Sequence, residues 1–323
     1  MALTHKIQQN KIQQSDKTLF SFELLPPLKG NSINEIYETI DYLKEFRPPY
    51  INITYHQAET VYKKLANGLL EPKVIRKRPG TVAIAAAIKN KYPDIDVVPH
   101  LICGGFTKEE TEDALIDLHF LGIKNVMLIR GDANVGNKRF VPKENGHKYA
   151  LGLVKQVQNL KNGIYLDQDL KNPVPLDFNI RVAGYPEKHI ESPNKQSDLY
   201  FLKQKVKAGA TSIVTQMFFD NQKYFDFVKD CRDYGIDVPI IPGIKPVSVI
   251  NHLNILPKTF NVDLPEALVK EIIKCKDNAC VRQVGIEWAI QQSKELKQHN
   301  VPSIHYYTMG NPDNIYQIAK EVF

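Results

Sequence analysis

The chain of 323 residues has few cysteines, and they show no pattern that binds metal or builds a disulfide scaffold. Cys103, Cys231, Cys275 and Cys280 form no C-x-x-C pair and accompany no paired histidine motif. We therefore expect neither a zinc site nor a disulfide framework, and a reduced, cytoplasmic protein. No run of about 18 apolar residues occurs, and residues 1–17 lack the apolar core of a signal peptide. The sequence predicts neither secretion nor a membrane span.

The sequence also lacks features that would divide the chain or mark hydrolytic enzymes. No composition break or Ser/Gly-rich linker occurs, so we expect one domain over residues 18–323 after a polar extension, 1–17. Neither a metal cluster nor a Ser-His-Asp arrangement is recognisable, which argues against hydrolysis by those routes. The net charge of +6 comes from scattered residues, which does not indicate nucleic acid and suits an anionic small molecule. The densest basic stretch, Lys73 to Arg78, resembles a solvated helix end.

Eight short apolar or β-branched runs alternate with helical patterns, as β-α units around a parallel sheet do. They span residues 18–25, 50–55, 96–102, 125–130, 178–184, 212–218, 238–243 and 303–308. Two capping-box patterns, Ser32-x-x-Glu35 and Thr107-x-x-Glu110, mark helix starts. Eight such units in this length predict an α/β fold, a single-domain (β/α)8 TIM barrel. A doubly wound open sheet is the alternative, but no G-x-G-x-x-G follows the first strand.

One carboxylate, Glu23, lies inside the apolar first strand, which ends at once in Pro26-Pro27. Burial disfavours the charged form of a carboxyl group and raises its pKa. Glu23 could therefore hold a proton near neutral pH and deliver it as a general acid. The alternative interpretation is a structural ion pair with one of the many Lys or Arg residues.

Unusual polar and aromatic residues stand at the ends of the other predicted strands. In a (β/α)8 barrel these ends converge on one mouth, where the chemistry is expected. The residues are Thr54, His56, His100, Arg130, Gly131, Asp132, Tyr185, Glu187, Lys188, His189, Gln216, Phe218, Phe219, Tyr306, Tyr307 and Thr308. Their aromatic and amide groups suit a flat heteroaromatic ligand and so a redox enzyme with a cofactor. Singly, His100 also fits a satisfied core histidine, and Arg130 with Asp132 a local ion pair.

The chain resembles the methylenetetrahydrofolate reductases of the short bacterial type. The resemblance is carried, in order along about residues 18–308, by SFELLPP, NITYH, PHLIC, LIRGD, AGYPEKH, SDLYFLKQKVKAGA, TQMFFD and IPGIKPV. It implies a (β/α)8 flavoprotein in which FAD takes a hydride from NADH or NADPH. FAD then passes it to 5,10-methylenetetrahydrofolate, and the 5-methyltetrahydrofolate formed supplies methionine synthesis. A cytoplasmic homo-oligomer is implied as well.

The resemblance also implies roles for individual residues. Glu23 would be the general acid that opens the folate ring to the 5-iminium cation, and Asp132 would lie beside the flavin pyrimidine. The implied cofactor-binding residues are Thr54, Tyr55, His56, His100, Arg130, Gly131, Asp132, Tyr185, His189, Asp198 and Lys205. The implied substrate-binding residues are Glu23, Gln216, Phe218, His252 and Leu256. Gln216 would bond the pterin amide edge, whereas Phe219 is expected in the core.

Three positions depart from the family pattern. His252 and Leu256 stand where the family commonly has glutamine and phenylalanine, and Asn311 stands where it commonly has arginine. We therefore expect weaker stacking there and leave the choice between NADH and NADPH open. The departures keep a second hypothesis open, a flavin subunit that takes electrons from a partner protein in a larger complex. A catalytically silent folate-binding barrel is the third. Without a long C-terminal regulatory domain, inhibition by S-adenosylmethionine is not expected.

Overall fold

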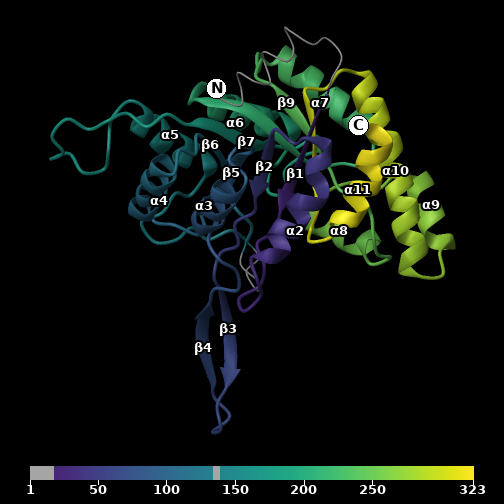
Figure 1. Ribbon diagram of the computed structural model, residues 1–323, viewed down its shortest axis with the longest axis horizontal. Helices are drawn as coiled ribbons and strands as arrows, with labels where there is room; N and C mark the ends of the chain where they lie inside the picture. The colour runs from purple at the N-terminus through teal and green to yellow at the C-terminus, as the bar shows by residue number, and fades with distance from the viewer. Residues whose placement is uncertain (1–17, 134–138) are drawn as a thin grey trace.

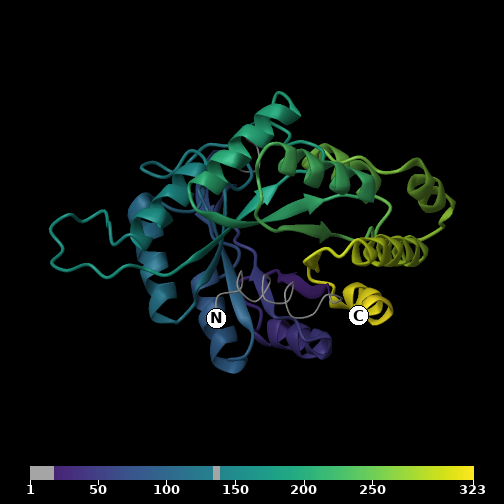
Figure 2. The same ribbon diagram turned by 90° about the horizontal axis from the view of Figure 1, so that it is seen from above.

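The computed structural model describes residues 18–133 and 139–323, and in them eight parallel strands close into a barrel (Figures 1 and 2). Around the barrel the order is β1-β10-β9-β8-β7-β6-β5-β2. The strands are β1 Leu19–Leu24, β2 Tyr50–Ile53, β5 Asp96–Ile102, β6 Asn125–Ile129, β7 Asn179–Gly184, β8 Ala210–Met217, β9 Ile240–Ile244 and β10 Ser303–Tyr307. The predicted TIM barrel and its eight strands are confirmed, and the open sheet is excluded. The predicted extension, residues 1–17, lies outside the described residues.

Helices cover the outside of the barrel, as Figure 2 shows. They are α2 Asn34–Leu43, α3 Thr81–Lys91, α4 Lys108–Phe120, α5 Ala150–Lys161, α6 Lys195–Lys207, α7 Asn221–Asp233, α8 His252–Phe260, α9 Glu266–Lys274, α10 Asn278–Gln298 and α11 Pro312–Val322, with a 3-10 turn η1 Lys44–Phe46. The capping box predicted at Thr107 is confirmed, since Thr107 and Glu110 bond each other's backbone N–H. The one predicted at Ser32 is wrong. Ile33 is the N-cap of α2, and Ser32 accepts instead from the N–H of Asn34 at 3.1 Å.

Alternation along each strand decides which side chains reach the barrel interior. Tyr50, Val98, Met127, Val214 and Ile241 pack together inside the barrel as one buried cluster. The intervening strand residues belong to the larger core between the strands and the helices. On each strand, the residue two positions after the cluster residue points to the same face. These residues lie nearer to the carboxyl ends of the strands. They form the mouth of the barrel.

The segment after β2 forms an antiparallel hairpin, which we call the arm: β3 Glu59–Lys64, β4 Leu70–Ile75 and the turn between them. It projects away from the barrel (Figure 1) and pairs with no barrel strand. The prediction that Lys73 to Arg78 ends a helix is wrong, because Lys73 lies in β4 and the next helix, α3, begins only at Thr81. Local basic composition cannot distinguish a solvated helix end from a solvated strand.

The cysteines also differ in part from the prediction. Cys275, after α9, and Cys280, in the first turn of α10, form a disulfide with their Cα atoms 5.4 Å apart. Cys103 and Cys231 are free and buried. The expectation that no cysteine is cross-linked is therefore wrong for this pair. A bridge spanning five positions joins two adjacent helices, and its spacing matches no motif by which the sequence would reveal it.

Candidate active site

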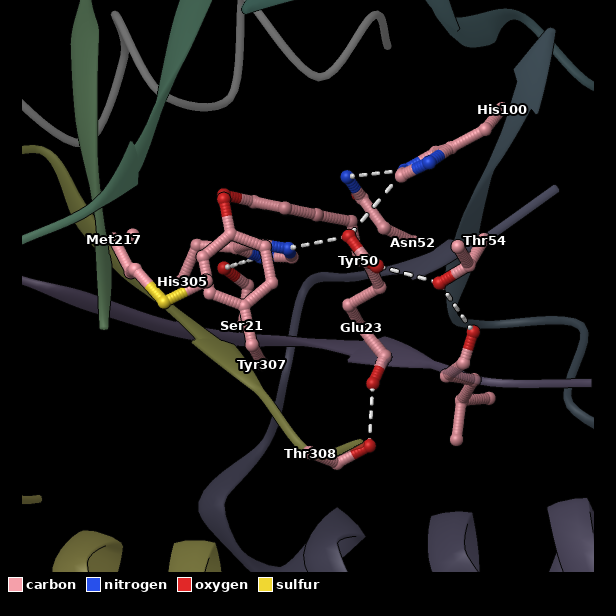
Figure 3. A network of polar contacts seen from close by, with 12 residues as sticks. Ser21, Glu23, Tyr50, Asn52, Thr54, His100, Met217, His305, Tyr307 and Thr308 are labelled. Carbon is pink, nitrogen blue, oxygen red and sulfur yellow. Dashed lines mark hydrogen bonds and ion pairs between the residues drawn. The ribbon is translucent and has the colours of Figure 1, made fainter. Parts of the chain in front are cut away.

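Glu23 lies at the mouth of the barrel in the middle of a polar network (Figure 3). Its Oε1 accepts a hydrogen bond of 2.5 Å from Thr54 Oγ1, just beyond the end of β2. Its Oε2 lies 3.6 Å from His100 Nε2 on β5 and 3.7 Å from His305 Nε2 on β10. The Glu23 side chain is 12% exposed, so a small part of the carboxylate can still meet a ligand. Side chains from β5, β10 and the end of β2 therefore converge on the carboxylate carried by β1.

Residues that sequence reasoning missed hold the two imidazoles in place. Ser21 Oγ lies 3.0 Å from His305 Nδ1, and Asn52 Nδ2 lies 3.2 Å from His100 Nε2. The buried side chain of Arg181 stacks on the Tyr50 ring below the network, with its guanidinium carbon 3.9 Å from the ring centroid. The alternation of side chains between the two faces of each predicted strand was the signal that could have identified these residues. Ser21 shares a strand face with Glu23, and His305 shares one with Tyr307.

The electrostatics of Glu23 differ from the sequence-based expectation. Burial does raise the pKa of Glu23, but the two imidazoles and the Thr54 hydroxyl outweigh it and bring the pKa to about 2. Burial in turn lowers the pKa of both His100 and His305, and Arg181 adds to that lowering. The prediction that burial keeps Glu23 protonated near neutral pH is therefore wrong for this arrangement. The proton belongs to a coupled group of one carboxylate and two imidazoles.

A second feature of the mouth is a cavity of about 550 Å³ beside β6 and β7, lined in part by residues of α5 and α6. Five of the predicted cofactor-binding residues line it: Arg130, Tyr185, His189, Asp198 and Lys205. Asp198 and Lys205 reach it from one face of α6, two turns apart, as their spacing of seven residues predicted. The cavity also has an apolar wall, which includes Leu151, Phe201 and Leu202. Apolar walls with a few convergent polar groups are typical of cofactor sites.

Charged groups in this cavity are already positioned by the protein. Arg130 forms a two-pronged ion pair with Glu191, with N···O distances of 2.7 and 2.9 Å. Asp198 accepts a hydrogen bond from the backbone N–H of His189 at 2.6 Å. Lys205 donates to the carbonyl of Ala183 at 2.9 Å, and burial lowers its pKa to about 8. The ammonium therefore stays mostly charged at neutral pH and is available to an anionic ligand.

The other predicted cofactor-binding residues surround the mouth without lining that cavity. Asp132 lies near Tyr185, whose pKa is raised by burial first and by the Asp132 charge next. Gly131 has a φ of +85°, which a side chain would oppose, and it turns the chain from Arg130 to Asp132. Tyr55 packs on Phe106 with ring centroids 4.9 Å apart. Thr54 and His100 belong to the Glu23 network. His56 follows Thr54 by two residues in the segment after β2, and it is exposed.

The predicted substrate-binding residues divide into two groups. Gln216 is half-buried on the inward face of β8, and its Oε1 accepts from the N–H of Met217 at 2.9 Å. His252 is also half-buried, at the start of α8. Phe218 is fully buried and stacks on Tyr224, because β8 ends at Met217 and the chain turns outward there. A substrate contact through Phe218 therefore does not fit the structure.

Leu256 does not fit a substrate-binding role either. It is 2% exposed and lies in a core cluster with Phe219 and Met217. The expectation that Phe219 belongs to the core is confirmed by the same cluster. With Leu256 turned inward, α8 offers no stacking ring at that position, and His252 Nδ1 accepts a hydrogen bond from the backbone N–H of Ser248 at 3.2 Å.

Together, the barrel, the buried carboxylate and the cavity of about 550 Å³ define an α/β-barrel protein with a polar site at the carboxyl ends of its strands. The chain belongs to the methylenetetrahydrofolate reductase family, whose model matches residues 6–322. The resemblance found in the sequence is thereby confirmed.

Curated relatives agree with this membership. The chain is 32% identical to methylenetetrahydrofolate reductase (NADH) 1 of Arabidopsis thaliana over 96% of its own length. It spans about half of that relative, 49%. It is 30% identical to the 5,10-methylenetetrahydrofolate reductase of Escherichia coli, covering 99% of this chain and 97% of the relative. The short bacterial type therefore fits.

Solved structures share the fold at lower similarity. An uncharacterized protein from Clostridium thermocellum, described as binding two copies of 5-methyl-5,6,7,8-tetrahydrofolic acid, has a TM-score of 0.57 at 14% identity. The alignment covers 99% of this chain and 98% of that one. A 2,3-dimethylmalate lyase has a TM-score of 0.51 at 9% identity, covering 99% of this chain and 83% of its own. At such identities these likenesses show the fold alone.

Proposed function

We propose that the protein is an FAD-dependent methylenetetrahydrofolate reductase that uses NADH or NADPH to make 5-methyltetrahydrofolate for methionine synthesis. The observation that carries the proposal is Glu23, a nearly buried carboxylate held by Thr54, His100 and His305 at the barrel mouth. Membership in the reductase family supports the reaction, and relatives are named for both NADH and NADPH. Among the described helices, none combines the length and apolar character needed to cross a bilayer. A cytoplasmic homo-oligomer is part of the proposal.

The cavity beside β6 and β7 fits FAD. Lys205 and Arg130 offer cationic donors to a diphosphate, and the apolar wall suits a flat ring system. When bound, FAD supplies a ping-pong hydride transfer, from NAD(P)H to itself and then to the 5-iminium form of the folate. Asp132 places a negative charge near this end of the mouth, where it favours the iminium cation. Gln216 offers an amide donor and acceptor to the pterin edge.

Glu23 is proposed to protonate the folate as its five-membered ring opens. A folate that covers Glu23 removes the remaining solvent contact of the carboxylate, and this desolvation moves its pKa upward from about 2. His305 offers a path along which the proton can arrive, because one ring nitrogen faces Glu23 and the other contacts Ser21. General acid catalysis therefore depends on the coupled group and on the bound substrate, rather than on burial alone.

An anaerobic visible spectrum tests the proposal as a whole. The purified protein should show a flavin spectrum that bleaches with NADH or NADPH and recovers when methylenetetrahydrofolate is added. A colourless protein that cannot be reconstituted with FAD would contradict the proposal. A flavin that neither nicotinamide bleaches would favour the subunit that depends on a partner protein.

Glu23→Gln tests the acid role. The variant should bind FAD and be reduced by NADH at nearly the parent rate, and it should lose about 10²- to 10⁴-fold in folate reduction, as expected for removing a general acid. Stopped-flow measurement of the two half-reactions separates these effects. Glu287→Gln, an exposed change on α10, is the matched control. Equal losses in both half-reactions would contradict the role.

A further inference from the structure

A fully buried cation lies inside the barrel, below the Glu23 network. Arg181, in the middle of β7, is 2% exposed, and its Nη1 and Nη2 atoms have no hydrogen-bond partner among the described residues. Within residues 18–133 and 139–323 it forms no ion pair with a carboxylate. A charge that is enclosed without a counter-ion is costly. Packing alone would favour an apolar side chain at this position, so the charge points to a further role.

Arg181 is connected to the active-site imidazole of His305 through Tyr50. Its guanidinium carbon lies 3.9 Å from the centroid of the Tyr50 ring, and that ring lies nearly parallel to the His305 ring, at 13° and a centroid distance of 6.2 Å. The Tyr50 hydroxyl also donates to Ser303 Oγ at 3.1 Å. Ser21 Oγ then lies 3.3 Å from Ser303 Oγ and 3.0 Å from His305 Nδ1 (Figure 3). Because all these side chains are buried, the cation and the imidazole keep a fixed arrangement.

Arg181 has uncharged neighbours on the strands beside it, since Met127 on β6 and Ser212 on β8 are in register with it. By strand alternation, the titratable or charged side chains on the inward faces are Glu23 (β1), Tyr50 (β2), Asp96 and His100 (β5), Tyr185 (after β7), Lys245 (after β9), and His305 and Tyr307 (β10). Asp96 begins β5 and Lys245 follows β9, so these two lie at opposite ends of the barrel. Between the two ends, the charge of the interior depends on Glu23 and the two imidazoles.

The charge of Arg181 acts on both imidazoles. Burial lowers the pKa of His100 and of His305, the Glu23 carboxylate opposes that lowering, and Arg181 adds to it. In the alternative arrangement, one imidazole would take the proton of the coupled group and hold Glu23 as a carboxylate. A positive charge enclosed below the two rings disfavours an imidazolium there.

We propose that Arg181 is a positioning residue for the acid step, because its fixed charge keeps His100 and His305 neutral and so leaves the proton of the coupled group to Glu23. The inference rests on the proposed function and deepens it, since it assigns the residue that decides where this proton lies. With folate over the site, the proton is then on the carboxyl group, which is more exposed than either imidazole. As the folate ring opens, the Glu23 O–H bond breaks and the proton joins the nitrogen that leaves the bridging carbon. The lone pair of the other nitrogen forms the iminium, and Glu23 is left as a carboxylate.

Histidine NMR on the FAD-loaded protein tests whether Arg181 keeps the imidazoles neutral. The signals of His100 and His305, assigned by their loss in His100→Gln and His305→Gln, should be those of neutral rings from about pH 6 to about pH 8. In Arg181→Met, at least one of the two rings should titrate with a pKa higher by about one unit or more. Arg181→Lys keeps the charge and should restore the neutral rings. Arg282→Met, an exposed change on α10, is the control and should leave both titrations as in the parent.

The pH dependence of folate reduction is a second readout, which a merely structural role would not move. In a single turnover of the reduced enzyme with methylenetetrahydrofolate, the parent rate should fall above one apparent pKa, where the coupled group loses its proton. Arg181→Met should move this pKa upward by about one unit, because the group then holds its proton without a positive charge below it. The rate below that pKa should fall by about tenfold or more, because the proton then lies on an imidazole. Arg181→Lys should recover both values.

The outcomes separate the inference from the proposed function. If the parent does not reduce methylenetetrahydrofolate, the proposed function fails, and the acid step fails with it. If the parent reduces the folate and Arg181→Met lowers the rate with an unmoved apparent pKa, Arg181 only supports packing, and its positioning role is refuted while the reductase stands. A parent in which His100 or His305 is protonated near pH 7 overturns the role as well. That measurement needs no variant of Arg181, so the test does not depend on the folding of Arg181→Met.

Discussion

At the scale of single residues, Lys245 is an unusual cation at the mouth. It follows β9 on the strand face of Ile241 and Gly243, and it is only 7% exposed. In the described part of the chain it has no hydrogen bond or ion pair. Burial lowers its pKa to about 8, and its charge, after desolvation, helps lower the pKa of His252 to about 4. The resemblance to the family gave no reason to single it out.

Lys245→Met should stabilise the protein at neutral pH. Because the folded pKa of about 8 lies below the ordinary 10.5, the unfolded chain holds this proton more tightly, and stability rises between pH 8 and 10.5. Below pH 8, Lys245 is charged in the folded protein as well, so the folded state bears the full free-energy cost of the buried charge. Removing the charge should raise the unfolding free energy by roughly 1 to 3 kcal/mol at pH 7.

Urea unfolding at pH 7 and at pH 10 measures this effect. The gain from Lys245→Met should shrink at pH 10, where the parent lysine is mostly neutral. Lys258→Met, at an exposed position on α8, is the control and should change stability by less than about 0.5 kcal/mol. A gain that is absent at pH 7, or the same at both pH values, would refute the buried-charge explanation.

At the scale of the elements, α10 crosses the segment after β9 at very close range. A Cβ placed on Gly285 would lie 1.8 Å from the carbonyl oxygen of Val247 and 2.9 Å from its nitrogen. Both are backbone atoms and cannot rotate away. Gly285 therefore sets the distance between α10 and the segment that carries Lys245, and so helps fix one side of the mouth.

Gly285→Ala should destabilise the protein, although alanine is favoured over glycine in helices generally. The usual gain is about 1 kcal/mol, but the overlap with Val247 forces a backbone shift, so we expect a net loss of roughly 2 kcal/mol or more. Thermal and denaturant unfolding measure it. Arg282→Ala, on the exposed face of α10, should be nearly neutral. A stabilised Gly285→Ala protein would show that α10 can move away without cost.

At the scale of the whole molecule, the arm is structurally separate from the barrel. Within residues 18–133 and 139–323, β3 and β4 pair only with each other. The arm exposes several large apolar side chains by more than 60%: Tyr62, Leu69, Leu70 and Val74. An isolated two-stranded hairpin contributes little to stability in water. The barrel should therefore fold without it.

Replacing residues 60–74 by Asn-Gly tests this separation. Glu59 and Ile75 are paired directly across the hairpin, so two residues can rejoin the chain while Arg76 and Arg78 stay. We expect unfolding of the shortened protein to stay cooperative, with a free energy within about 1 kcal/mol of the parent. Circular dichroism during urea titration measures it. Loss of cooperative folding would mean that the arm belongs to the structural core or to an obligate assembly.

The sequence by itself determined the barrel and much of the site. Eight alternating strand patterns fixed the architecture, because β-branched runs and helix caps are local signals. The spacing of Asp198 and Lys205 placed both on one face of α6 for the same reason. Glu23 stood out because a carboxylate in an apolar strand is costly wherever the strand lies. The turn of the arm carries a local hairpin signal, Asn67-Gly68, which the strand prediction did not use, whereas the Cys275–Cys280 disulfide has no such signal.

Only the tertiary structure decided the charge of Glu23 and the shape of the mouth. The pKa of Glu23 falls because His100 and His305, distant in the chain, meet it across the closed barrel. Likewise, Phe218 and Leu256 turn into the core because of what packs around them. Burial of these side chains depends on which elements pack together, and electrostatic energy depends on distances between charges. Those distances exist only once the strands have closed into a barrel.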